Sequence, residues 1–419
     1  MNRQSSRVHY AWIVAAVTFT VLLITAGVRA TPGLLMVPLE SEFGWNRAVV
    51  SGAVAINIAL FGLIGPFAAS VIDRFGLRRI VLIALALLAT SVALSTRMHS
   101  RWQLTLLWGV LVGTGTGATS MVLAAIVATR WFDQRRGLVL GALSAANATG
   151  QLVFLPLLAS VVETQGWRPA TLVVAGAAAA VFVLVLLFMR DRPESIGLRP
   201  YGQTSTQPTS TARPLAPIAA LRLATKSRAF WVLAGTFFIC GASTNGLIGT
   251  HLIAACHDVG IPVVRSAQLL AMMGIFDIVG TTASGWLTDR YSSRHLLCAY
   301  YALRGVSLLF LPTALLGGSG SLGWFAVFYG LDWIATVPPT VRLTSEAFGK
   351  ENTGVIYGWI GASHQLGASL AALGAGSIRA SLGDYRMAFY AAGVLCVLAG
   401  LSFVTVGRRT FPRLVPATA

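Results

Sequence analysis

Twelve long apolar runs, separated mostly by short loops, dominate the sequence. The runs cover residues 11–36, 48–72, 79–96, 103–129, 137–161, 169–189, 229–254, 266–287, 295–315, 322–341, 353–378 and 385–406. A helix needs about 20 residues to cross the hydrocarbon core of a bilayer, where only its own carbonyls can satisfy its backbone amides. Only 11% of the 419 residues are charged, less than half of the roughly 25% in soluble domains. The sequence therefore predicts an all-α membrane protein with twelve transmembrane helices, and excludes a soluble or disordered chain.

One polar stretch interrupts this pattern after the sixth run. Residues 190–228 are rich in Pro, Ser, Thr and Arg, a composition typical of a solvated linker. We therefore expect a six-helix bundle over residues 1–189, a linker over 190–228, and a second six-helix bundle with a short tail over 229–419.

The basic residues are distributed unevenly between the two sets of loops. The net charge of +17 would suggest nucleic acid in a soluble protein, but here the charges lie between apolar runs. The tails, the linker and every second loop carry 22 Lys and Arg, whereas the opposite loops carry seven. Because cytoplasmic loops are enriched in Lys and Arg, both termini and the linker are expected in the cytoplasm, with the protein in the cell membrane. The first apolar run has no small-residue cleavage site, so we expect it to be a retained helix.

The two halves repeat a short motif. The sequence Asp-Arg-Phe-Gly-Leu-Arg-Arg at 73–79 follows the second run, and Asp-Arg-Tyr-Ser-Ser-Arg at 289–294 follows the eighth, with an offset of 216 residues. Two related six-helix halves around a central cavity are what a rocking secondary transporter needs.

On these motifs the sequence resembles the major facilitator superfamily over nearly its whole length. That family's loop signature is Gly-x-x-x-Asp-Arg-x-Gly-x-Arg-Arg; the second copy keeps the opening Gly285, which the first replaces by Ala69. The resemblance implies that the loops close the cytoplasmic side through charge pairs at helix ends. The alternative is that their arginines only set the topology. The gate residues implied are Asp73, Arg74, Gly76, Arg78, Asp289 and Arg290.

Within that superfamily the chain is most similar to the monocarboxylate-transporter-like group. Residues 130–137, Arg-Trp-Phe-Asp-Gln-Arg-Arg-Gly, resemble that group's fifth-helix signature, and Phe-Asp-Ile-Val at 276–279 resembles its eighth helix. The arginine that animal members carry one turn later is Thr281 here, and of the first-helix signature only Trp12 is kept. The drug-antiporter signature of helix 5 is not matched at 150–156. The resemblance implies proton-coupled transport of monocarboxylates.

Five ionisable residues inside predicted spans are candidates for the site: Arg29, Asp277, Arg304, Asp332 and His364. A charge at the bilayer centre costs about 2.5–3.5 kcal/mol on insertion scales, so each needs a partner or a polar cavity. Arg29 either captures a substrate anion or extends to the outer surface. Either Asp277 or Asp332 is expected to pair with Arg304, and protonation of such a carboxylate would couple protons to conformation. His364 changes charge near neutrality and is either a binding or a structural residue.

Uncharged polar residues complete the expected site. Asn57 and Asn245 are substrate-binding candidates beside Arg29 and His364, and weaker candidates are Asn147 and Gln151. We find no metal constellation, nucleophile triad or phosphate-cradling loop, and so expect no enzyme chemistry, no cofactor and no nucleic-acid partner. The four cysteines match no zinc or disulfide pattern.

The sequence thus predicts a monomeric, proton-coupled secondary transporter of small organic anions that works by alternating access. One alternative is proton-driven efflux of a drug or amphiphilic metabolite. A transporter-like membrane sensor is a more remote alternative.

Overall fold

The computed structural model describes residues 9–203, 215–317, 319–349 and 351–405, and this part of the chain is almost entirely helical. Its first half contains α1 (Tyr10–Phe43), α2 (Arg47–Phe75), α3 (Leu77–Ser95), α4 (Arg101–Leu104), the π-helix η1 (Thr105–Leu111), α5 (Val112–Ala118), α6 (Met121–Trp131), α7 (Arg136–Gln165) and α8 (Trp167–Phe188). The connection carries a 3-10 turn, η2 (Pro193–Ile196), and a short helix, α9 (Pro217–Ala224).

The second half repeats this order of crossings. It contains α10 (Arg228–Gly241), the π-helix η3 (Ala242–Ile248), α11 (Gly249–Asp258), α12 (Val263–Arg290), α13 (Ser293–Leu316), α14 (Ser319–Asp332), α15 (Val337–Phe348), α16 (Thr353–Leu382) and α17 (Arg386–Thr405). Each of the twelve predicted runs therefore lies on one helical crossing of the bundle.

Nine of these crossings, counted over the described residues, are long and apolar enough to span a bilayer by length and composition. The other three are the crossings of α7, of α14 with α15, and of α16. The run at 322–341 is broken because α14 ends at Asp332 and two prolines, Pro338 and Pro339, open the next helix. Proline has no amide hydrogen and is tolerated in the first turn of a helix, so a new helix starts at α15 instead of α14 continuing.

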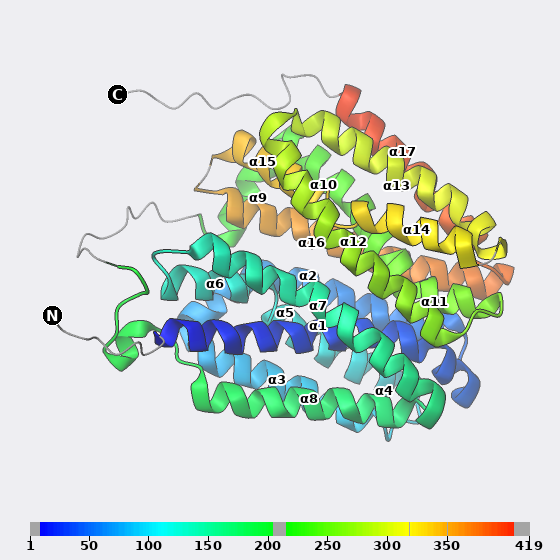
Figure 1. The fold of residues 1–419 in the computed structure, drawn as a ribbon, viewed down its shortest axis with the longest axis horizontal. Helices are drawn as coiled ribbons and strands as arrows, with labels where there is room; N and C mark the ends of the chain where they lie inside the picture. Colours follow the sequence, from blue (N-terminus) through cyan, green and yellow to red (C-terminus); the bar gives the residue numbers. More distant parts are fainter. Residues whose placement is uncertain (1–8, 204–214, 318, 350, 406–419) are drawn as a thin grey trace.

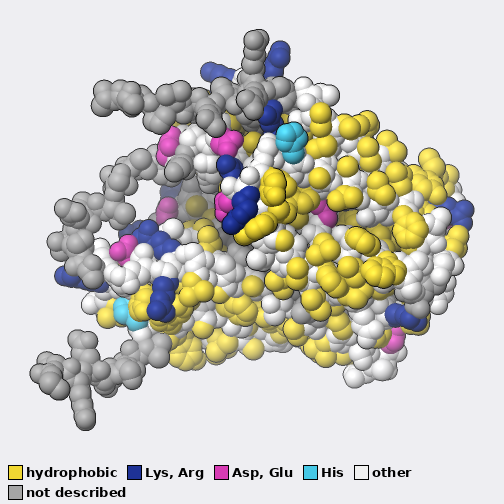
Figure 2. Space-filling model, turned by 45° about the horizontal axis from the view of Figure 1, so that its top comes forward, with side chains coloured by type: hydrophobic (Ala, Val, Ile, Leu, Met, Phe, Trp, Pro, Cys, Tyr) yellow, Lys and Arg dark blue, Asp and Glu magenta, His cyan; other side chains and the backbone are white. Residues whose placement is uncertain are grey.

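The two halves form neighbouring bundles joined mainly by two helix pairs. α2 packs along α16, and α7 packs along α12 (Figure 1). Close approach of α2 and α16 depends on a missing side chain, because a Cβ on Gly62 would lie 2.3 Å from Cβ of Gln365. Such small-residue contacts replace apolar burial, since lipid is as apolar as the helix surfaces. A broad apolar belt covers the outside, and charged side chains gather at the two ends of the molecule (Figure 2).

The bundles converge toward one end and diverge toward the other (Figure 1). We name the convergent end, where α1 and α11 end and α2 and α12 begin, the closed end. The opposite end, where α1 begins and α17 ends, is the terminal end. Hydrogen bonds between the halves, among described residues, lie at the closed end or midway along the helices. Midway, the Ser369 hydroxyl donates to the Ala55 carbonyl at 2.8 Å.

Candidate functional site

A cavity of about 410 Å³ lies between the halves, with walls from α1, α2 and α5 on one side and from α10, η3, α12 and α16 on the other. All four residues predicted to bind substrate line it: Arg29, Asn57, Asn245 and His364. Asp277, predicted to carry the proton, lines it as well. The structure therefore brings together residues that lie up to 335 positions apart in the sequence.

Arg29 contributes the positive charge of the N-terminal wall. It is half-buried on α1, and its guanidinium carbon lies 4.5 Å from the ring centroid of Phe61 on α2. Stacking on an aromatic face holds a planar cation in place without neutralising it. The side chain thus belongs to the cavity wall and not to the outer surface of the bundle.

The two asparagines are held by helix irregularities. Asn57 donates its amide hydrogen to the Trp108 carbonyl at 2.6 Å, and Trp108 lies in the π-helix η1, where the wider turn frees carbonyl groups. The second amide hydrogen and the side-chain oxygen of Asn57 remain for a ligand. Asn245 lies in the second π-helix, η3, and its backbone carbonyl accepts a hydrogen bond from the Thr250 hydroxyl at 2.8 Å.

His364 lies on α16 against an aromatic wall of the C-terminal half. Its ring centroid is 4.7 Å from that of Phe237. The backbone of α16 is in close contact with α10 here, because a Cβ on Gly241 would overlap the His364 carbonyl. The imidazole is therefore fixed relative to α10 and reaches the cavity beside Cys240.

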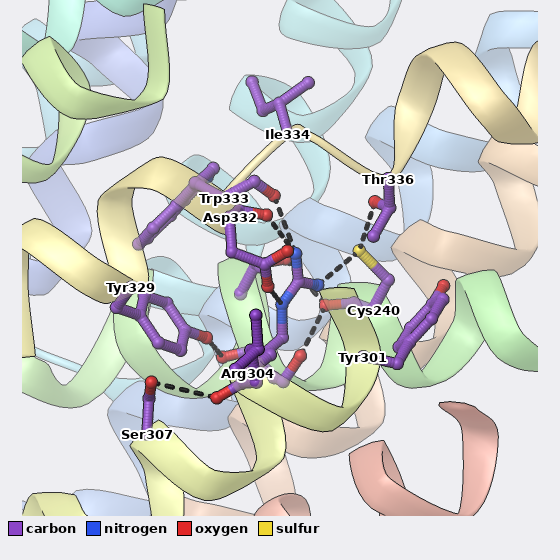
Figure 3. A network of polar contacts seen from close by, with 12 residues as sticks. Cys240, Tyr301, Arg304, Ser307, Tyr329, Asp332, Trp333, Ile334 and Thr336 are labelled. Carbon is purple, nitrogen blue, oxygen red and sulfur yellow. Dashed lines mark hydrogen bonds and ion pairs between the residues drawn. The ribbon is translucent and has the colours of Figure 1, made fainter. Parts of the chain in front are cut away.

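Arg304 is fully buried and pairs with Asp332, which settles the choice that the sequence left open (Figure 3). Its Nε donates to the Asp332 carboxylate at 2.6 Å, and one Nη donates to Cys240 Sγ at 2.7 Å. The other Nη donates to the backbone carbonyls of Asp332 and Trp333. Those carbonyls are available because α14 ends at Asp332, so the guanidinium satisfies the end of a broken helix.

Asp277 attaches to the same helix break from the other side. Its Oδ1 accepts hydrogen bonds from the Thr281 hydroxyl and from the backbone amide of Ile334, both at 2.9 Å. It is 5% exposed. Its described partners are therefore neutral donors, and the residues between α14 and α15 are held by Asp277 and Arg304 together.

The predicted gate residues form their described contacts within one half each. Asp73, at the end of α2, forms an ion pair with Arg130 at the end of α6. Gly76 has a φ of 93°, and a Cβ there would lie 3.0 Å from the Asp191 carboxylate, which accepts the backbone amide of Arg78 at 2.8 Å. The charge pair at helix ends is thus present, but in this conformation it joins helices of the N-terminal half.

Two further gate residues, Arg74 and Arg290, lie over neighbouring aromatic rings. The Arg74 guanidinium lies 5.3 Å from the Phe75 ring, and that of Arg290 lies 4.0 Å from the Trp286 ring. Asp289 is exposed beside Arg290. These residues stand at the terminal end, where the halves diverge.

Charged residues at the closed end join the two halves, although in the sequence they are ordinary loop charges with no motif. Arg47 on α2 donates to Glu40 at 2.6 Å and to the Tyr385 hydroxyl at 2.9 Å, and lies 3.5 Å from Asp258 of α11. On the other flank, the Glu163 carboxylate of α7 accepts the backbone amide of Val264, in the first turn of α12, at 3.0 Å. The side chains of Asn147 and Gln151 lie outside the described residues.

Comparisons with known proteins agree on one family. A family model described as Major Facilitator Superfamily matches residues 17–372. The uncharacterized MFS-type transporter YcxA of Bacillus subtilis is 27% identical over 372 residues, 87% of each chain. Monocarboxylate transporter 13 of Rattus norvegicus is 29% identical over 396 residues, 93% of this chain and 87% of that protein.

The solved structures give the same fold. A bacterial homologue of the human lysosomal transporter Spinster, in an inward-facing and unoccupied conformation, superposes with a TM-score of 0.79 at 16% identity. The superposition covers 98% of this chain and all of the other. The occupied form of that protein gives a TM-score of 0.75.

Proposed function

The chain belongs to the major facilitator superfamily, and on that premise we propose that this membrane transporter moves small organic anions, first of all monocarboxylates, together with protons. The family and fold are those of transporters and not of enzymes. The similarity to several monocarboxylate transporters supports the substrate class. The two bundles, residues 1–189 and 229–419, would rock against each other about the cavity, with one chain as the functional unit.

The observation that carries the proposal is the position of Arg29. A carboxylate loses most of its hydration on entering a low-dielectric cavity, and a fixed guanidinium offsets that cost. Arg29 provides one in the wall formed by the N-terminal half, stacked on Phe61. Asn57, Asn245 and His364 would add hydrogen bonds to the same anion.

Asp277 is the proposed proton carrier. It lines the cavity and its Oδ1 contacts only neutral donors among the described residues, so protonation breaks no ion pair. A protonated oxygen no longer accepts well from the Ile334 amide, which would release one of the two ties on the residues between α14 and α15. Arg304 and Asp332 would keep the other tie, so a proton on Asp277 would change the position of α15 without unfolding it.

The charge distribution supports an orientation. By sequence, the tails, the linker and every second loop carry 22 basic residues, and the described loops of this set lie at the terminal end, so we place that end in the cytoplasm. The conformation described would then be inward-facing, with the closed end outside.

One feature of the cavity favours the alternative substrate. Four aromatic side chains line its walls: Phe61, Phe237, Trp333 and Tyr357. They would suit the apolar body of an amphiphilic metabolite leaving the cell, so aromatic acids and export both belong in the test.

Proteoliposomes test the proposal directly. Labelled monocarboxylates, from short aliphatic to aromatic acids, are offered with an imposed pH gradient of either direction. We expect at least one acid to accumulate when the proton gradient points into the vesicle. Arg29→Lys keeps the charge but loses the planar guanidinium, so its apparent affinity should be weaker. Arg29→Gln should bind no anion. Arg97→Gln, which removes an exposed loop arginine, is the matched control.

The outcomes separate the alternatives. Accumulation only with the reversed gradient would indicate export. If Arg29→Gln binds a transported acid as tightly as the parent and Arg97→Gln, by thermal shift of the purified protein, the anion site lies elsewhere.

A further inference from the structure

A part-buried cluster of four charged side chains at the closed end has no net charge. Arg47 and Arg379 are its cations, and Glu40 and Asp258 are its anions. Asp258 accepts from Arg379 at 2.6 Å while it faces Arg47 at 3.5 Å, so one carboxylate of α11 serves α2 and α16 together. The Arg47 side chain is only 6% exposed. An additional charge placed here would have no counter-charge.

His251, fully buried on α11, lies next to this cluster. Its Nε2 is 2.8 Å from the Ala372 carbonyl of α16, an acceptor, so Nε2 carries the hydrogen. Its Nδ1 is 3.1 Å from the Tyr385 hydroxyl, which itself accepts from Arg47 at 2.9 Å. Tyr385 must then donate its own hydrogen to Nδ1, and the chain Arg47–Tyr385–His251–Ala372 is complete only with a neutral imidazole.

The tyrosine is suited to this role. A tyrosine phenol has an ordinary pKa of about 10, so the Tyr385 hydroxyl keeps its hydrogen near neutral pH. The ring centroids of Tyr385 and His251 lie 5.2 Å apart, and Tyr385 itself is 3% exposed. The only link from the N-terminal half to the histidine within the described contacts runs through this hydroxyl.

We propose that His251 is a second proton-binding site, and that its protonation opens the closed end. A proton on Nδ1 removes the acceptor of the Tyr385 hydrogen. The N–H groups of both Arg47 and His251 then point at the Tyr385 oxygen, and the hydrogen of Tyr385 has no acceptor. It also adds a positive charge beside Arg47 in a cluster whose charges already balance. Separating α2 from α11 and Tyr385 relieves both penalties, because it lets water reach the imidazolium and the arginine.

The other charged groups nearby do not supply the missing counter-charge. Glu40 of α1 is engaged by Arg47, and Asp258 of α11 is shared by two arginines. At the start of α17, Asp384 and Arg386 form an exposed pair at 3.7 Å. Arg379 of α16 is a further cation. The elements packed around the imidazole thus present carboxylates that are already paired.

This site acts separately from Asp277. Asp277 lines the cavity, whereas His251 lies at the closed end and is absent from the cavity lining among the described residues. On the proposed orientation the closed end faces outside, so acid there would favour the outward-open state that collects substrate.

Spin labels on exposed serines on the two sides of the closed end test this inference without substrate or gradient. Ser41 of α1 and Ser381 of α16 are changed to cysteine, and a Ser41–Arg97 cysteine pair within one half is the control pair. From about pH 8 to about pH 5, the range in which histidine changes charge, the fraction with a long Ser41–Ser381 distance should rise by about tenfold. The control pair should not change.

Two substitutions locate the proton. His251→Gln keeps a donor for Ala372 and an acceptor for Tyr385 but cannot be charged, so its distances should stay at the high-pH values throughout. His257→Gln removes an exposed histidine of the same helix and should keep the full response.

Three results would overturn the inference. They are a parent protein whose distances do not depend on pH, a His251→Gln variant with the parental response, and loss of the response in His257→Gln. Tyr385→Phe is a second variant, for the case that His251→Gln misfolds. It removes the hydroxyl that links Arg47 to His251, so the fraction of molecules with a long Ser41–Ser381 distance should rise at high pH as well. None of these readouts depends on the identity of the substrate, so failure of the proposed function leaves the test intact.

Discussion

Removal of the Arg304 side chain tests how the broken helix between α14 and α15 is held. Arg304→Gln deletes a buried ion pair of 2.6 Å to Asp332 and the donors to the carbonyls of Asp332 and Trp333. It leaves Asp332 as an uncompensated buried carboxylate whose Oδ1 already lacks a hydrogen-bond partner. Breaking one member of a buried pair costs about 3–5 kcal/mol, so the free energy of unfolding should fall by that amount.

Thermal unfolding of purified variants measures this loss. Arg386→Gln removes one member of an exposed pair, side chains 59% and 52% exposed, and should cost only about 0–1 kcal/mol. The double variant Arg304→Met/Asp332→Leu removes both charges and should recover most of the stability, because an apolar pair of similar volume is often neutral. Equal unfolding midpoints for Arg304→Gln and Arg386→Gln would refute the reasoning, and so would a double variant less stable than Arg304→Gln.

Two further predictions concern coupling and topology. Asp277→Asn keeps the shape of the side chain and removes its titratable proton, so accumulation driven by a pH gradient should stop while substrate exchange continues at equal protein level; retained accumulation would transfer the role to Asp332 or His364. A reporter fused after Ala419 or inserted at Thr206 should be cytoplasmic, and labelling of either site from outside intact cells would reject the orientation.

The crossings of the bundle could be predicted from the sequence because lipid imposes a simple rule. A run of about 20 apolar residues has no alternative to a helix in hydrocarbon. The rule does not predict where a helix ends inside an apolar run, and the partner of Arg304 depends on such an end, that of α14. Asp277 and Asp332 are equally plausible partners by sequence distance. The choice falls on Asp332 because the end of α14 brings two free carbonyls to the same guanidinium.

The closed-end cluster could not be predicted for a different reason. His251 also lies inside an apolar run, 229–254, but only three positions from its end, and no periodicity or motif relates it to Tyr385, 134 residues away. In the sequence Arg47 and Arg379 look like ordinary loop charges. Only the packing of α2 on α16 and of α1 on α11 brings them into one part-buried group. The cavity residues were more accessible to prediction, because an ionisable side chain inside an apolar run is conspicuous.

The repeat links the two contacts that hold the halves together at the closed end. The offset of 216 residues that relates Asp73 to Asp289 also relates Arg47 to Val263 and Glu163 to Arg379. The start of α2 therefore meets the end of α16 through charges, and the start of α12 meets the end of α7 through a carboxylate on a backbone amide.

The chemistry of these equivalent positions differs, and the difference decides what can control them. Glu163 gains from the positive end of the α12 dipole, an interaction that water and salt readily replace when the halves part. The Arg47 cluster is neutral as a whole, and on our proposal a fifth charge, from a protonated His251, favours its opening. Of the two contacts, the Arg47 cluster is the one for which the described residues show a neighbouring histidine, His251. The two related halves can thus separate at both contacts together, although the proposed proton binds beside only one of them, the Arg47 cluster.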